Sequence, residues 1–238
     1  MKRDLTRERI VEAAYDLLNR EGREALSTRA VCAASGVQSP TIYRLFGDKR
    51  GLLDAVACHG FEAYLAGKTA LAETDDPVDD LRRGWDLHVE FGTSNPALYS
   101  LIYGDARPGV ESPAAERASA VLAKQVKRIA EAGRLRVSEE RAAHLIHAAG
   151  CGMVFTLISL PPQDRDPDLS TLARESVIAA VTTEPSTTPA KTDAVTAAVT
   201  LRSVAPTVTA LTDNERALLS DWLNRIATTT DPAHHEQR

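Results

Sequence analysis

Polar side chains that can bind nucleic acid are concentrated on a short segment near the N-terminus, residues 39–46. Within the sequence SPTIYRLF, Ser39, Thr41, Tyr43 and Arg44 carry hydroxyl, phenol and guanidinium groups, whereas Ile42 is placed to enter a small core. Exposed donors of these types pack poorly but can hydrogen-bond to phosphates and base edges. The segment therefore predicts a surface that contacts a nucleic acid.

The elements around this segment fit a helix-turn-helix. Residues 6–21 have the apolar spacing of a first helix, and residues 28–34 form a short second helix that Gly36 ends. Ser39-Pro40 is a helix-start signal for residues 41–46, and Asp48 is placed to cap the helix that follows. Two short helices joined by a tight turn have the dimensions of a motif whose second helix enters the major groove.

The run from Ala33 to Leu53, AASGVQSPTIYRLFGDKRGLL, resembles the signature of the tetracycline-repressor (TetR) family, and the resemblance covers about the first quarter of the chain. In that family the corresponding positions contact phosphates, which implies this role for Thr28, Tyr43 and Lys49. The resemblance also implies base contacts from Arg29, Gln38, Ser39, Pro40 and Thr41. Arg44 lies where family members vary, so its contact is left open between DNA and solvent.

The charge distribution fits a DNA-binding head on a larger body. Residues 1–60 contain ten Lys or Arg against eight Asp or Glu, whereas the remainder has eighteen against twenty-five. A basic head on an acidic body is expected when only the head meets phosphate.

Frequent alanine, few aromatic residues and long helical periods predict an all-α fold. We expect a three-helix helix-turn-helix domain at residues 1–55 and a larger helical effector-binding and dimerisation domain at 56–182. A linker at 183–190 would lead to C-terminal helices at 191–227 that pack on the body, with Thr212 and Glu215 as a capping box. The tail at 228–238 is expected to be disordered.

The body contains two apolar segments that predict a dimer interface. Residues 139–159 are apolar nearly all round in their second half, and residues 168–182 carry a second apolar stripe. A helix without a polar face must be covered on both sides. The resemblance implies that two such helices pair with their symmetry mates; the alternative is that both complete a monomeric core.

Aromatic and imidazole side chains of the body indicate a pocket for a small-molecule effector, because apolar walls with a few polar groups suit ligands. The candidates are Trp85, His88, Phe91, Tyr99, Tyr103, His144 and His147. An ordinary core with tyrosines at its rim is the alternative. His144, His147 and Cys151 share one helix face, but a fourth ligand is not evident, so we predict no metal site and no cofactor.

The sequence as a whole predicts a cytoplasmic, homodimeric transcriptional repressor that a small molecule releases from a palindromic double-stranded operator, with no membrane partner. An enzyme is disfavoured because no phosphate loop, Gly-x-Ser-x-Gly elbow or catalytic Cys/His arrangement is found. Two alternatives remain, namely an activator or ligand-blind DNA-binding protein with the same head, and a purely structural helical protein.

Overall fold

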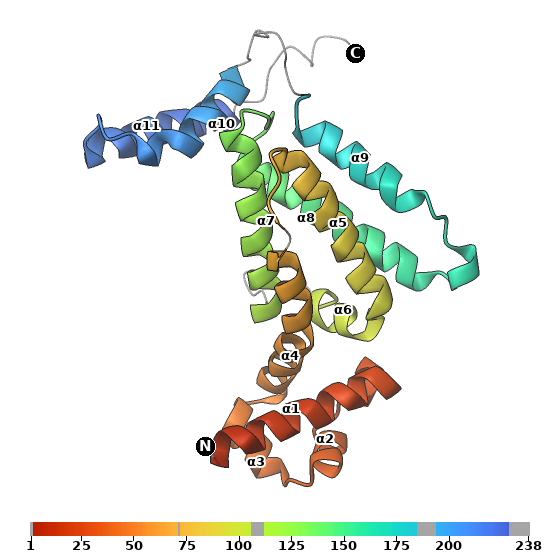
Figure 1. Ribbon diagram of the computed structural model, residues 1–238. Helices are drawn as coiled ribbons and strands as arrows, with labels where there is room; N and C mark the ends of the chain where they lie inside the picture. The colour runs from red at the N-terminus through yellow and green to blue at the C-terminus, as the bar shows by residue number, and fades with distance from the viewer. Residues whose placement is uncertain (1, 71, 106–111, 185–193, 229–238) are drawn as a thin grey trace, which may run out of the picture. The chain divides into compact units, whose positions relative to one another are not determined.

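The computed structural model describes residues 2–70, 72–105, 112–184 and 194–228, and over these ranges the chain is α-helical without a strand (Figure 1). The all-α prediction is confirmed. The helices are α1 (Lys2–Glu21), α2 (Thr28–Ser35), α3 (Ser39–Phe46), α4 (Lys49–Ala70), α5 (Pro77–Ser94), α6 (Pro96–Tyr103), α7 (Pro113–Glu131), α8 (Glu139–Ser159), α9 (Leu169–Val181), α10 (Ala194–Val204) and α11 (Asp213–Thr228). Short 3₁₀ turns, η1 (Arg23–Ala25), η2 (Pro162–Asp164) and η3 (Ala205–Thr207), lie between them.

The chain divides into two compact units that do not follow the order of the sequence. Unit 1 consists of Met1–Ala72, Asp86–Ala120 and Val154–Arg165, and unit 2 of Glu73–Trp85, Val121–Met153 and Asp166–Arg238. Helices α5, α7 and α8 contribute residues to both units. The boundary predicted at residue 55 falls inside α4.

The N-terminal helices of unit 1 enclose a small apolar core. Ile10 and Leu18 of α1, Val31 of α2 and Ile42 of α3 are completely buried, and α4 adds Val56. Helix α1 packs against α2 and α4, and α3 packs against the same two helices. Because Val31 and Ile42 point inward, the remaining faces of their short helices are left to solvent.

Unit 2 has its own core, which joins helices that are distant in sequence. Its buried residues come from six helices, α5 and α7 to α11, and a connecting segment, and include Val126, Ile129, Leu135, Ile146, Ile178, Val199 and Leu223. Helix α8 is the one helix in the described ranges whose length and hydropathy would suffice to cross a membrane, although such a helix is also typical of soluble cores. Only a third of its apolar window is buried, so much of α8 remains uncovered within the chain.

The cap residues agree with the sequence in two places and differ in one. Asp48 Oδ1 accepts a hydrogen bond of 2.8 Å from the Gly51 N–H, and the Thr212 N–H donates to Glu215 Oε2 at 2.8 Å, which confirms both predicted caps. Ser39 is instead the first residue of α3, with Gln38 at the N-cap position. The Thr41 N–H donates to the Gln38 carbonyl, which starts the helix earlier than expected. The predicted linker after Glu184 and the tail after Thr228 lie outside the described residues.

Candidate nucleic-acid interface

The turn between α2 and α3 is fixed by three local features. Ser27 caps α2, since its Oγ accepts a hydrogen bond of 3.1 Å from the Ala30 N–H. Gly36 ends α2 in the left-handed conformation, with φ of 68°, which glycine adopts without steric cost. The Val37 N–H then donates to the Cys32 carbonyl at 3.2 Å, so the chain reverses within two residues.

The predicted DNA-contacting side chains lie on the surface of this motif. Tyr43 is 51% exposed although its neighbour Ile42 is completely buried. The exposed members of the predicted set are Arg29, Gln38, Ser39, Pro40, Tyr43, Arg44 and Lys49, and the half-exposed members are Thr28 and Thr41. Donors from the start of α2, from α3 and from the start of α4 are therefore all available to a groove and its flanking phosphates.

Helices α3 and α4 approach so closely that one position accepts only glycine. A Cβ atom added to Gly51 would lie 2.0 Å from the carbonyl oxygen of Phe46. A side chain at this position would therefore force the end of α3 away from α4.

We predict that Gly51→Ala destabilises the N-terminal helices by about 1–3 kcal/mol, because the backbone must shift to relieve the clash. Operator affinity should fall with it. Gly67→Ala is the control in the same helix, since nothing lies within 4 Å of a Cβ there; it should stabilise the helix by about 1 kcal/mol. Thermal unfolding followed by circular dichroism measures both, and equal melting temperatures would contradict the predicted strain.

Two arginines that the sequence did not single out hold the head together and connect it to α6. Arg7 of α1 lies over the Phe46 ring, 5.3 Å from its centroid, which favours a cation–π contact. Arg23 of η1 donates to the Ser100 carbonyl at 3.1 Å and to Asp105 Oδ2 at 2.7 Å. The sequence around Arg23 does not indicate its contacts, because both of its partners are more than 70 residues away in sequence.

Four of the predicted effector-binding residues come together in unit 1. His88 Nε2 lies 2.9 Å from the Tyr99 hydroxyl, and the rings of Phe91 and Tyr103 adjoin Tyr99. Tyr64 joins this cluster, with its ring stacked on Phe91 at 4.4 Å between centroids. Phe61 and Phe155 complete it. We call these seven residues the aromatic cluster; Phe61, Tyr64 and Phe155 were not predicted, because their helical spacing fits any core helix.

The other three predicted effector residues belong to unit 2 and are not members of the aromatic cluster. Trp85 is buried, and its indole N–H donates to Ser170 Oγ at 3.1 Å. His144 and His147 are exposed on α8, and His147 Nε2 lies 3.6 Å from the Cys151 sulfur. In the described ranges no three metal-ligating side chains converge.

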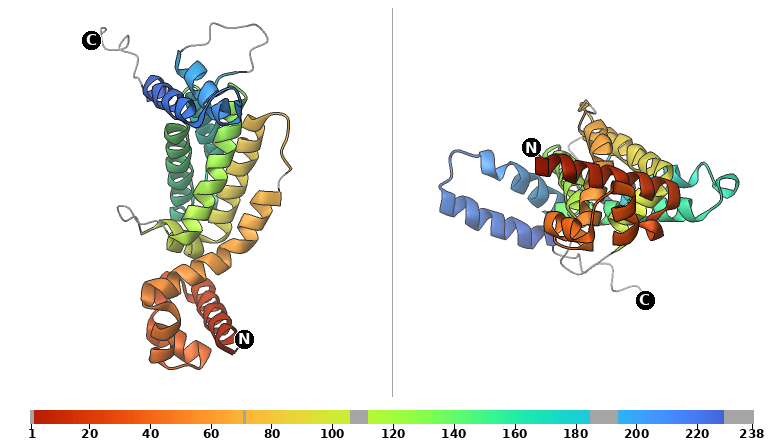
Figure 2. Two further views of the ribbon diagram at one scale, coloured as in Figure 1. Left: turned by 90° about the vertical axis from the view of Figure 1, so that its left-hand side faces the viewer. Right: turned by 90° about the horizontal axis from the view of Figure 1, so that it is seen from below.

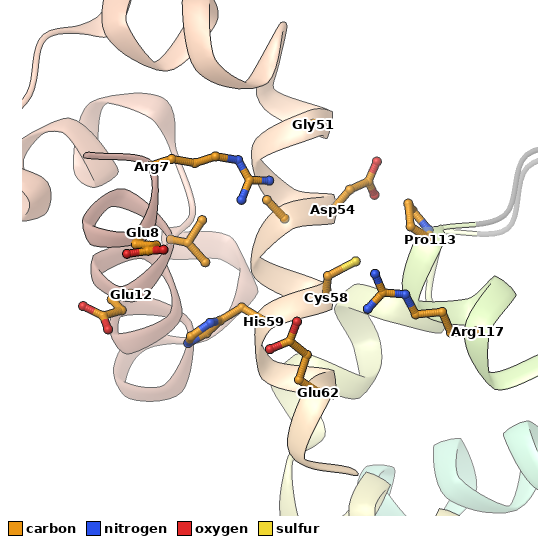
Figure 3. A pocket seen from close by; sticks show the side chains of 12 residues that line it. Arg7, Glu8, Glu12, Gly51, Asp54, Cys58, His59, Glu62, Pro113 and Arg117 are labelled. Carbon is orange, nitrogen blue, oxygen red and sulfur yellow. The ribbon is translucent and has the colours of Figure 1, made fainter. Parts of the chain in front are cut away.

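A cleft of about 740 Å³ opens in unit 1 between α1, α4 and the start of α7 (Figure 3). Figure 3 shows the Cys58 thiol and the Arg117 guanidinium facing one another across it. Burial raises the pKa of the Cys58 thiol, which outweighs the opposing effect of Arg117. Charged groups of both signs line the cleft, namely Arg7, Glu8, Glu12, Asp54, Glu62 and Arg117. This mixed lining selects no single class of ligand.

Comparison with known proteins identifies a family whose sequence profile matches the N-terminal helices. Residues 10–56 match the sequence profile described as "Bacterial regulatory proteins, tetR family". These residues include most of the head core and all of the predicted DNA-contacting side chains.

Individual relatives fall into short, closer matches and long, distant ones. The chain is 47% identical over 53 residues to the tetracycline repressor protein class C of Escherichia coli, covering 22% of this chain and 24% of that protein. It thus spans about a quarter of the length of the tetracycline repressors that it matches. It is 27% identical over 153 residues to the nucleoid occlusion factor SlmA of Marinobacter nauticus, which covers 63% of this chain and 78% of SlmA.

A solved structure of another protein shares the fold over most of this chain. A TetR-family transcriptional regulator from Haemophilus influenzae superposes with a TM-score of 0.55 at 22% identity, covering 77% of this chain and all of that one. About a quarter of this chain therefore has no counterpart in that structure.

Proposed function

Because this chain belongs to the TetR family by its N-terminal domain, we propose that the protein is a transcriptional repressor that binds a palindromic operator as a homodimer in the cytoplasm. A small-molecule effector bound by the helical body would release it. The tetracycline repressor and the TetR-family transcriptional regulator named above are regulatory proteins, which agrees with the prediction that the protein is not an enzyme.

The exposed polar face of α3 is the observation that carries the proposal. Tyr43 and Arg44 are exposed to solvent while Ile42 anchors the helix in the core, so this face of α3 is accessible to a partner. Exposed donors on a short helix suit the major groove, where phosphate contacts set the register and base-edge contacts set the sequence.

Selection of bound fragments from genomic DNA, followed by titration of the best fragment, tests this function directly. We expect a palindromic site and an affinity that falls steeply with salt, because phosphate contacts release counterions. Binding that shows no preference over random DNA would contradict the proposal. A reporter gene behind the selected site then separates repression, in which deletion of the regulator raises expression, from activation, in which deletion lowers it.

Homodimerisation is supported by the uncovered apolar surface of α8 and α9. Leu145 of α8 and Leu172 of α9 are 42% and 62% exposed. A head of this size reads few base pairs, so a symmetric pair is needed for useful specificity. A second copy would cover the part of α8 that the chain itself leaves open.

The aromatic cluster is our candidate effector site. Its stacked rings offer apolar walls, and His88 with the Tyr99 and Tyr64 hydroxyls supplies polar groups inside them. An amphipathic ligand with an aromatic ring and one hydrogen-bonding group fits this chemistry. Because Tyr99 is completely buried, such a ligand must displace part of the cluster, which gives it a preference for one conformation over another.

Helix α6 connects this cluster to the head. Tyr99 and Tyr103 of α6 belong to the cluster, while the Ser100 carbonyl of the same helix and Asp105, just after its end, accept hydrogen bonds from Arg23. A ligand that moves α6 would therefore pull on η1, which joins α1 to α2.

We predict that Arg23→Ala leaves operator affinity within about 3-fold of wild type, because Arg23 is not one of the predicted DNA-contacting residues and its ion pair with Asp105 is partly exposed. The effector concentration needed for half-release should rise by at least about 5-fold, because the connection to α6 is lost. Anisotropy of the labelled operator, titrated with a compound that a release screen recovers, measures both. Arg20→Ala at the end of α1 is the matched control, and identical release curves for the two variants would contradict this route.

A further inference from the structure

Helix α11 presents an apolar stripe to solvent. Leu218, Trp222 and Ile226 follow one another at intervals of four residues and are 49%, 51% and 41% exposed. On the opposite face, Leu223 and Ala227 are buried in the core of unit 2. The stripe is therefore the outward side of a helix whose inward side is already occupied.

The stripe is held rigidly rather than being a loose end. Helices α10 and α11 pack side by side as a hairpin (Figure 2). Arg216 at the start of α11 donates to the Val208 and Leu211 carbonyls at 3.0 and 2.6 Å, and Arg202 of α10 binds both Asn224 of α11 and Glu139 of α8. A surface fixed in this way loses little conformational entropy when a partner binds.

Two charged residues beside the stripe can form ion pairs between two antiparallel copies of α11. Asp221 and Arg225 lie one turn apart on the same flank of the stripe. When two copies of α11 pack antiparallel about an axis at Trp222, Leu218 meets Ile226 of the other copy and each Asp221 adjoins the other Arg225. In a parallel pair the flank that carries both residues would face the opposite flank of the other copy, so Asp221 and Arg225 would not meet.

We propose that the α11 stripe is a second self-association surface, which pairs antiparallel with the same stripe of another copy of this chain. This inference rests on the homodimer proposed above, which uses α8 and α9. Figure 1 shows the α10–α11 hairpin and α9 on different sides of unit 2, so pairing through α9 leaves the stripe uncovered.

The area of the stripe predicts a weak contact between dimers. Its three side chains expose roughly 300 Å² per copy, below the roughly 800 Å² per partner of a standard interface. The stripe alone therefore does not hold two chains together at low concentration. It joins dimers that already exist into a tetramer when their concentration rises.

Sedimentation velocity of the full-length protein between roughly 1 and 300 µM tests the proposal. We expect dimers at the low end and a concentration-dependent shift to tetramers at the high end. Trp222→Gln should weaken tetramer formation at least about 30-fold, because a central Trp on each side of the contact is lost. Leu201→Gln, an exposed leucine of α10 outside the stripe, should leave it unchanged.

Charge reversal identifies the partner as a second copy in antiparallel orientation. Asp221→Arg and Arg225→Asp should each abolish the tetramer, and the double variant should restore it, because the pairing is reciprocal. A wild type that remains dimeric at every concentration, a Trp222→Gln variant that associates as wild type does, or a double variant that fails to recover would each overturn the inference.

The homodimer is checked separately with Leu172→Glu on α9. This variant should be monomeric at low concentration while the stripe is intact. If the wild type itself is monomeric at low concentration, the proposed homodimer fails. If Trp222→Gln yields monomers, the homodimer itself forms through α11, and the proposal of a second surface is overturned.

Discussion

The double variant Tyr43→Phe, Lys49→Ala should lose at least about 100-fold in operator affinity at 0.15 M salt, because each head loses a hydrogen bond and an ion pair to phosphate. A homodimer has two heads, so these contacts are lost twice. The slope of log affinity against log salt should also become shallower by about 2, one for each missing lysine. Fluorescence anisotropy across a salt series measures both quantities.

The folded state should be nearly unchanged in this variant, since both replaced side chains are exposed. Its melting temperature therefore separates a lost DNA contact from a lost fold. Lys127→Ala on α7 is the control for charge alone, because Lys127 is exposed on the body. If the double variant bound as tightly as Lys127→Ala, the α3 face would not be the DNA-binding surface.

Asp80→Asn should lower the free energy of unfolding by about 3 kcal/mol, because it removes the shared partner of two arginines in a buried network. Asp80 is only 5% exposed. Its carboxylate accepts hydrogen bonds from the Thr74 backbone N–H and hydroxyl, and from Arg83 and Arg128. Urea unfolding at pH 7 measures the loss. Asp79→Asn, one residue away but 57% exposed at its side chain, should cost less than about 1 kcal/mol.

The same network predicts how stability depends on pH. Burial alone would raise the pKa of Asp80, but the hydrogen bonds from Thr74, Arg128 and Arg83 outweigh it and hold that pKa well below its usual range. A carboxyl group with a lowered folded-state pKa adds stability above its unfolded pKa of about 3.9, and this stability is lost as the pH falls further. The Asp80→Asn variant should therefore lose less stability than wild type between about pH 5 and pH 3. Parallel curves for the two proteins would contradict this role.

The local features of the head were visible in the sequence because each depends on residues a few positions apart. The turn at Gly36 and the cap at Asp48 are contacts within three or four residues along the chain. The alternation of buried Ile42 with exposed Tyr43 follows from helical periodicity. Such patterns also predicted the all-α fold and the capping box at the start of α11.

The effector site was predicted only in part, because it depends on which helices meet. His88, Phe91, Tyr99 and Tyr103 lie on two consecutive helices, and the structure brings them together. Trp85 is only three residues from His88, yet it belongs to unit 2, where its partner is Ser170. Tyr64 joins the cluster from α4 without any local signal.

The sequence by itself therefore determined the helices, their caps and the polar face of α3, since periodicity and capping act over one or two turns. Only the tertiary structure decided that Arg23 binds the end of α6, that Asp80 binds Arg128, and that Leu218, Trp222 and Ile226 remain outside the core. The physical reason is that periodicity establishes which residues share a helix face, whereas the packing of distant helices decides which face each one meets.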